Sequence, residues 1–111
     1  MKQTILNVIE WAEQRNLIAE KNSSMQFVKI VEELGELAKE HTRGGKNLDM
    51  IMDAIGDILV TLIIYAEDLD LAQQLNIQAK DVLEAALNKA YNEIKERQGE
   101  LVNGSFVKYE S

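Results

Sequence analysis

The chain has no cysteine and no proline, six glycines and 5% aromatic residues. Without cysteine it has no disulfide, no zinc thiolate and no thiol nucleophile. A β-barrel or sandwich needs turn residues at every ten or so positions, and no such spacing occurs in this sequence. The abundant Leu, Ile, Ala, Glu and Lys instead favour helices throughout the chain.

A long hydrophobic run is also missing. The longest apolar stretch, residues 54–66, contains Asp57 and is shorter than the ~20 residues that span a bilayer. The first residues, MKQTILNVIEWAEQ, are interrupted by polar and acidic residues, unlike a signal peptide. We therefore expect a cytoplasmic protein with no membrane partner.

Basic residues are outnumbered, 12 against 19 acidic ones, and the net charge is −7. An acidic chain repels nucleic acid over most of its surface, so we expect no nucleic-acid partner. A polyphosphate ligand would have to be bound through metal ions and a small local group of Lys and Arg.

Apolar residues recur at helical spacing in four segments of the chain. They predict helices over residues 3–15, 25–42, 48–67 and 78–98, followed by a short tail, 99–111. The short connectors between these segments predict one all-α domain, 1–111, folded as an antiparallel four-helix bundle. The upper part of the third helix is apolar all round, which predicts more hydrophobic surface than one subunit can hide, and hence an oligomer.

Local signals mark the ends of these helices. Ser23 and Gln26 have the spacing of a capping box, and Asn47 can cap the third helix. After that helix, EDLDLAQQLN is either a frayed continuation or a short separate turn capped by Asp70. The tail contains the turn signal NG, and we expect it to be too short for a sheet of its own.

Acidic residues gather on one face of the second helix, opposite an apolar stripe. Taken alone, this pattern is typical of a solvated face. The acidic residues are Glu32, Glu33, Glu36 and Glu40, and the stripe is Val28, Val31, Leu34, Leu37 and Ala38.

The third helix changes this interpretation, because Asp49, Asp53 and Asp57 form one stripe that leads into its apolar part. We therefore expect Asp57 in a dry region. No Lys or Arg occurs between Lys46 and Lys80, so its partner must come from another helix or be a cation.

Two helical glycines, Gly35 and Gly56, suggest a close approach of the second and third helices. Such an approach brings Glu33 and Glu36 to face Asp53 and Asp57. Four carboxylates in one small volume require cations, and oxygen-only ligands suit Mg²⁺ or Mn²⁺.

With these motifs the sequence resembles a known family. QFVKIVEELGELAKE and DAIGDILVTL are similar to the MazG-like all-α nucleoside triphosphate pyrophosphohydrolases, relatives of the dimeric dUTPases. ALNKAYNEIKERQG and GSFVK resemble the basic helix and tail of the short phage- and Firmicute-type members. Glu33 and Glu36 match the family's Glu-x-x-Glu, and Asp57 matches the Asp of its second motif. Ala54 stands where that motif has Glu, and Asp53 is the nearest substitute.

The resemblance implies Mg²⁺-dependent hydrolysis of a nucleoside triphosphate to monophosphate and pyrophosphate, in nucleotide-pool sanitation. It implies metal ligation by Glu33, Glu36, Asp53 and Asp57, with Glu33 or Glu32 as the general base. It also implies a homodimer or dimer of dimers, whose subunits complete each other's sites. Residues expected to bind the substrate are Lys89 and Arg97, which match basic positions of the family, with Asn92, Lys95, Lys29 and Gln26.

Two other interpretations stay open. One is a non-enzymatic helical interaction module whose acidic residues serve only solvation. The other is a degenerate family member that binds nucleotides without hydrolysing them, as Ala54 suggests. A ferritin-like di-metal bundle is excluded, because it needs two Glu-x-x-His pairs and His41 is the sole histidine.

Overall fold

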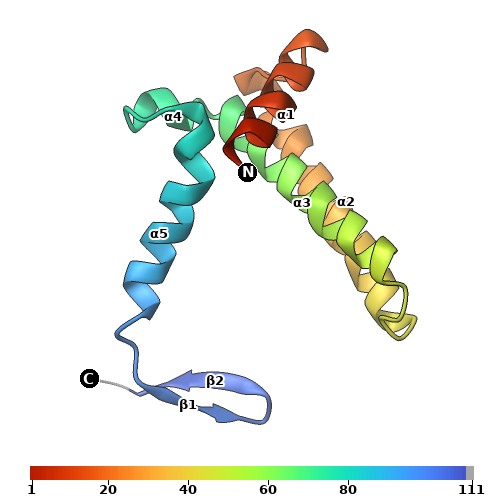
Figure 1. Ribbon diagram of the computed structural model, residues 1–111, viewed down its shortest axis with the longest axis vertical. Coiled ribbons are helices and arrows are strands. Elements are labelled where there is room, and N and C mark those ends of the chain that lie inside the picture. The colour runs from red at the N-terminus through yellow and green to blue at the C-terminus, as the bar shows by residue number, and fades with distance from the viewer. Residues whose placement is uncertain (110–111) are drawn as a thin grey trace.

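A computed structural model describes residues 1–109, which are mostly helical (Figure 1). The four predicted helices are present as α1 (Lys2–Gln14), α2 (Ser23–Thr42), α3 (Leu48–Asp68) and α5 (Val82–Ile94). The connectors hold the short helix α4 (Leu71–Gln74) and two 3₁₀ turns, η1 (Glu20–Asn22) and η2 (Ala79–Asp81). After α5 come two strands, β1 (Gly99–Val102) and β2 (Ser105–Lys108). The helical class is therefore confirmed, with a small hairpin added.

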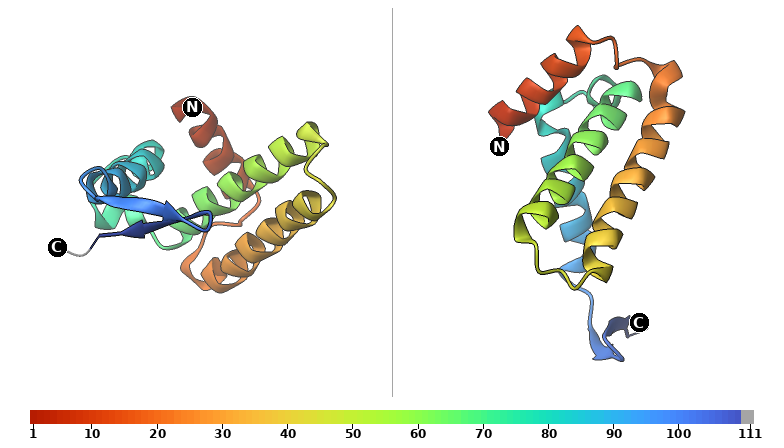
Figure 2. Two further views of the ribbon diagram at one scale, coloured as in Figure 1. Left: turned by 90° about the horizontal axis from the view of Figure 1, so that it is seen from below. Right: turned by 90° about the vertical axis from the view of Figure 1, so that its right-hand side faces the viewer.

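The hydrophobic core lies where α1 packs on α3 (Figure 2). Ile5 and Ile9 of α1 pack on Ile63 of α3, and these three side chains are buried. Partly buried residues from α1 itself, from the loop after it, from η2 and from α5 surround them: Val8, Ile18, Ala79 and Leu83. Helices α2 and α3 run antiparallel and side by side below this core (Figures 1 and 2). Across residues 1–109, no helix is long and apolar enough to cross a membrane.

The start of α2 differs from the sequence prediction. Asn22 occupies the N-cap position and no side chain caps the helix, so the predicted capping box is wrong. Gln26 Nε2 donates instead to the backbone oxygen of Thr61, 3.2 Å away, and thereby ties α2 to α3.

The start of α3 has the cap that its sequence predicts, and its end matches one of the two predicted forms except for the cap. At its start, the Asn47 side chain accepts a hydrogen bond from the Met50 N–H at 3.2 Å, so the predicted cap is confirmed. At its end, Asp70 takes a left-handed conformation, with φ of 55°, and α4 follows as a separate turn. Asp70 makes no side-chain capping bond to α4.

The tail forms a hairpin, so the expectation that it is too short for a sheet is wrong. Strands β1 and β2 pair antiparallel, with Leu101 opposite Phe106. Asn103 and Gly104 have φ of 51° and 82°, the left-handed conformations that a tight two-residue hairpin turn requires. A side chain at Gly99 would collide with the Phe106 ring and with the backbone oxygen of Val107. The turn and this glycine together allow four residues on each side to pair.

Helix α5 leads away from the α2–α3 pair (Figure 1). It ends at Ile94, so Lys95 and Arg97 follow the helix rather than lying within it. The radius of gyration is 16.6 Å, whereas a compact domain of this length has about 13 Å. The described residues of one chain do not close a four-helix bundle, so the predicted bundle is not confirmed.

Candidate carboxylate site between α2 and α3

A cavity of about 140 Å³ lies along one side of the α2–α3 pair. It brings together the four carboxylates that the sequence predicts as metal ligands. Its lining residues are Glu33, Glu36 and Glu40 from α2, and Met50, Asp53, Ala54 and Asp57 from α3. Glu40 was not predicted to belong to the site, although its position four residues after Glu36 places it on the same face.

The acidic side of α2 is better covered than its apolar side. Within Ser23–Thr42, the one buried residue is Glu40, and Glu33 is half-buried. The apolar stripe is largely exposed, with Val31 at 54% and Leu34 at 56%. An amphipathic helix of a monomer ordinarily buries its apolar side. Of the four acidic residues, Glu33 and Glu40 are thus at least partly covered, while Glu32 and Glu36 are exposed.

The cavity is open to solvent in one chain. Asp57 and Glu36 are exposed, so the expectation that Asp57 lies in a dry region is wrong for a single chain. The reason is that α1 packs on α3 further along, at Ile63. Asp57 lies before that covered part.

The two helical glycines do not mediate close packing within the chain. Among residues 1–109, and leaving aside the adjacent residues and the helix's own backbone, no atom lies within 4 Å of the place that a Cβ would take at Gly35 or Gly56. The predicted role in the α2–α3 approach is therefore wrong. Both positions face open space beside the helix pair.

Ion pairs neutralise some acidic residues near the cavity. The Arg43 guanidinium lies 3.2 Å from Glu40 Oε1. Glu32 pairs with Lys29 at 3.5 Å and does not line the cavity. In residues 1–109, by contrast, none of the four predicted metal ligands forms an ion pair with Lys or Arg.

The donor set of the cavity consists of carboxylate oxygens, which is the chemistry that Mg²⁺ and Mn²⁺ prefer. In the described part of the chain, no three His, Asp or Glu side chains stand close enough to hold one ion together. The residue types thus fit a hard divalent cation, but their side chains do not converge on one point.

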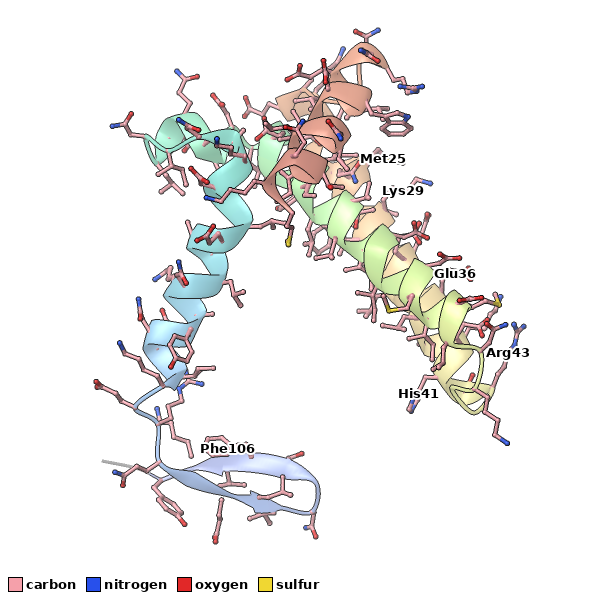
Figure 3. The ribbon with its side chains drawn as sticks, viewed as in Figure 1. Met25, Lys29, Glu36, His41, Arg43 and Phe106 are labelled. Carbon is pink, nitrogen blue, oxygen red and sulfur yellow. The ribbon has the colours of Figure 1, made fainter. Side chains whose placement is uncertain are left out.

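The predicted phosphate-binding residues lie apart from this cavity. Lys89 and Asn92 belong to α5, where Lys89 Nζ contacts Glu93 Oε1 at 3.2 Å. Figure 3 shows Glu36 on the side of the α2–α3 pair that faces away from α5. Helix α5 of the same chain therefore does not bring its basic residues to the carboxylates.

Comparisons with known proteins add one relative. The chain is similar to a bacteriophage protein. This is the uncharacterized 18.2 kDa protein in the rep-hol intergenic region of Haemophilus phage HP1, with 39% identity over 67 residues. The matched stretch is 60% of this chain and 40% of the relative, so it spans less than half of the relative's length. No family model matches the chain, and no solved structure does.

Proposed function

We propose that the protein is a Mg²⁺-dependent pyrophosphohydrolase that converts a nucleoside triphosphate, or its deoxy form, to monophosphate and pyrophosphate. The observation that carries this proposal is the arrangement of α2. Its acidic residues share a cavity with Asp53 and Asp57, while its apolar stripe is left exposed. If the carboxylates served only solvation, the apolar stripe on the opposite side of α2 would ordinarily be buried, whereas it is exposed. The reaction itself is taken from the resemblance of the two acidic motifs to the MazG-like enzymes, whose role is nucleotide-pool sanitation.

The carboxylates have different roles in this proposal. Glu33, Glu36, Asp53 and Asp57 would hold the metal. When bound, Mg²⁺ neutralises phosphate charge and makes a water molecule easier to deprotonate. Glu33 is the better general base, because Glu32 is engaged by Lys29 outside the cavity.

A second copy of the chain completes the site in this proposal. The accessible surface is 8600 Å², whereas a compact monomer of this mass has about 6,200 Å². Burying the excess of about 2,400 Å² from each chain would give an interface in the range of obligate homodimers. In such an assembly, a partner's α5 can reach the cavity that the chain's own α5 does not. The partner's Lys89 and Asn92 on that helix, and the partner's Lys95 and Arg97 just after it, would then contact the phosphates.

A pyrophosphate-release assay tests the activity. Wild type is incubated with a panel of NTPs and dNTPs, with and without Mg²⁺, beside Asp57→Asn and the control Asp49→Asn. Asp49 carries the same charge on the same helix but does not line the cavity. We expect Mg²⁺-dependent release by wild type and the control, and none by Asp57→Asn. No pyrophosphate from any nucleotide would overturn the proposal.

A second candidate function is nucleotide binding without hydrolysis. Ala54, 5% exposed, lies on the cavity wall where the resembled motif has Glu, so one expected ligand is missing. Calorimetry with a non-hydrolysable dNTP distinguishes the two. Tight Mg²⁺-dependent binding that Asp57→Asn abolishes, together with no pyrophosphate release, would favour this function.

A further inference from the structure

A second cavity, of about 700 Å³, lies at the other end of α3. Its walls are the loop after α1 with the start of η1, the last turn of α3, and the segment leading into α4. It shares no lining residue with the carboxylate site. The function proposed above makes no use of it.

Asp68, on the wall of this cavity, is an unusual carboxylate. Asp68 is 2% exposed. Oδ1 accepts a hydrogen bond from the Ala19 N–H at 2.9 Å, which fixes the orientation of the carboxylate. Oδ2 is buried, and among residues 1–109 it makes no hydrogen bond. A buried carboxylate oxygen without a partner is costly, and such groups ordinarily have a ligand, a counter-ion or a proton.

The surroundings of Asp68 are negative. Glu20, Glu67 and Asp70 also line the cavity, and no Lys or Arg is among its described lining residues. The C-terminal end of the 21-residue α3 adds the negative end of the helix dipole, and its last turn carries no basic residue. The charges that line the cavity therefore favour a cation.

The pKa values of two acidic groups at this cavity are raised. Burial raises the pKa of the Asp68 carboxyl, against the opposing effect of the Ala19 hydrogen bond. Burial also raises the pKa of Glu67, and the charges of Glu13, Asp70 and Asp68 raise it further. A bound positive charge would relieve both groups.

The size and walls of the cavity indicate what kind of cation fits. No three acidic or histidine side chains in the described chain stand close enough to hold one metal ion. The volume is also far larger than a metal ion needs. Ile18, Leu69 and Leu71 add apolar wall to the carboxylates, which suits an alkyl chain that carries N–H donors.

We propose that this cavity is a binding site for an organic polyamine, whose ammonium groups pair with the carboxylates of Asp68 and Glu67 and whose alkyl chain lies on the apolar wall. The site is independent of the nucleotide chemistry. It depends on geometry that one chain holds by itself.

Calorimetric titration with spermidine tests this site, at physiological ionic strength and with the full chain. We expect saturable 1:1 binding by wild type. Asp68→Asn keeps an acceptor for the Ala19 N–H and should weaken binding at least tenfold. Glu100→Gln, an equal loss of charge on the exposed strand β1, should leave the affinity within twofold.

Several results would overturn the proposal. These are the absence of saturable binding, an equal loss in Asp68→Asn and Glu100→Gln, or full displacement of spermidine by Mg²⁺ at the same stoichiometry. Should Asp68→Asn fail to fold, the half-buried Glu67→Gln replaces it and should weaken binding at least threefold. Because the readout is amine binding, failure here leaves the pyrophosphohydrolase proposal standing, and the reverse also holds.

Discussion

The exposed apolar stripe of α2 leads to a quantitative prediction about assembly. Leu34 is 56% exposed in one chain, so a partner that covers it would bury roughly half of the side chain. Full burial of a Leu contributes about 1.5–3 kcal/mol, which gives about 1–1.5 kcal/mol for that half. In a two-fold symmetric dimer the residue occurs twice, so Leu34→Ala should weaken association by about 2–3 kcal/mol. At about 1.4 kcal/mol per tenfold, this raises the dimer Kd by about 30- to 150-fold.

Sedimentation equilibrium over a range of concentrations measures this Kd. Leu75→Ala is the matched control, because Leu75 is 59% exposed but lies just after α4, away from the α2–α3 pair. The dimer Kd of Leu75→Ala should change less than threefold. Circular dichroism should show equal helix content in the two variants. A wild type that stays monomeric at all concentrations refutes the reasoning. So does an equal change in the two variants, because α2 would then not form the interface.

Three further predictions concern the two sites. Glu33→Gln should lower kcat for pyrophosphate release by about 10²–10⁴-fold, the usual contribution of a general base, whereas Glu32→Gln should lower it by less than tenfold. Inactive Lys89→Ala and inactive Asp57→Asn can be mixed and refolded together, which should restore about a quarter of wild-type activity. Half of the dimers would then be mixed, and each mixed dimer would hold one intact site of two. If no activity is recovered, both residues belong to one chain's site. Because burial raises the pKa of Asp68 above its ordinary 3.8, the folded state holds that proton more tightly than the unfolded state. Unfolding free energy should therefore fall as the pH rises from about 4 through the raised pKa, and Asp68→Asn should flatten this dependence in urea titrations.

The helices and the acidic motifs follow from local chemistry. Helical periodicity, the Asn47 cap and the NG turn act over a few residues, so the sequence alone predicts them. The same spacing places Glu33 and Glu36 on one side of α2, and Asp53 and Asp57 on one side of α3. Their convergence on one metal ion stays a prediction: the four line one cavity, but in the described chain no three acidic or histidine side chains stand close enough to hold one ion.

Two other local inferences were wrong, one because a longer-range contact competed and one because a local turn closed a hairpin. Gln26 has the spacing for a capping box, but its amide reaches the Thr61 carbonyl on α3 instead. The tail was expected to form no sheet, yet the left-handed Asn103 and Gly104 close a hairpin. In each case the residue types were compatible with both outcomes, and neighbours decided between them.

By itself the sequence determined that this protein is helical, where its helices lie, and which carboxylates share a helix face. The tertiary structure alone decided that the acidic side of α2 borders a cavity while its apolar side stays uncovered. It also decided that α5 leads away from the α2–α3 pair. It alone placed Asp68 in a buried position with one oxygen lacking a partner. The physical reason is that periodicity defines the two sides of a helix, whereas only packing between distant segments determines what each side meets.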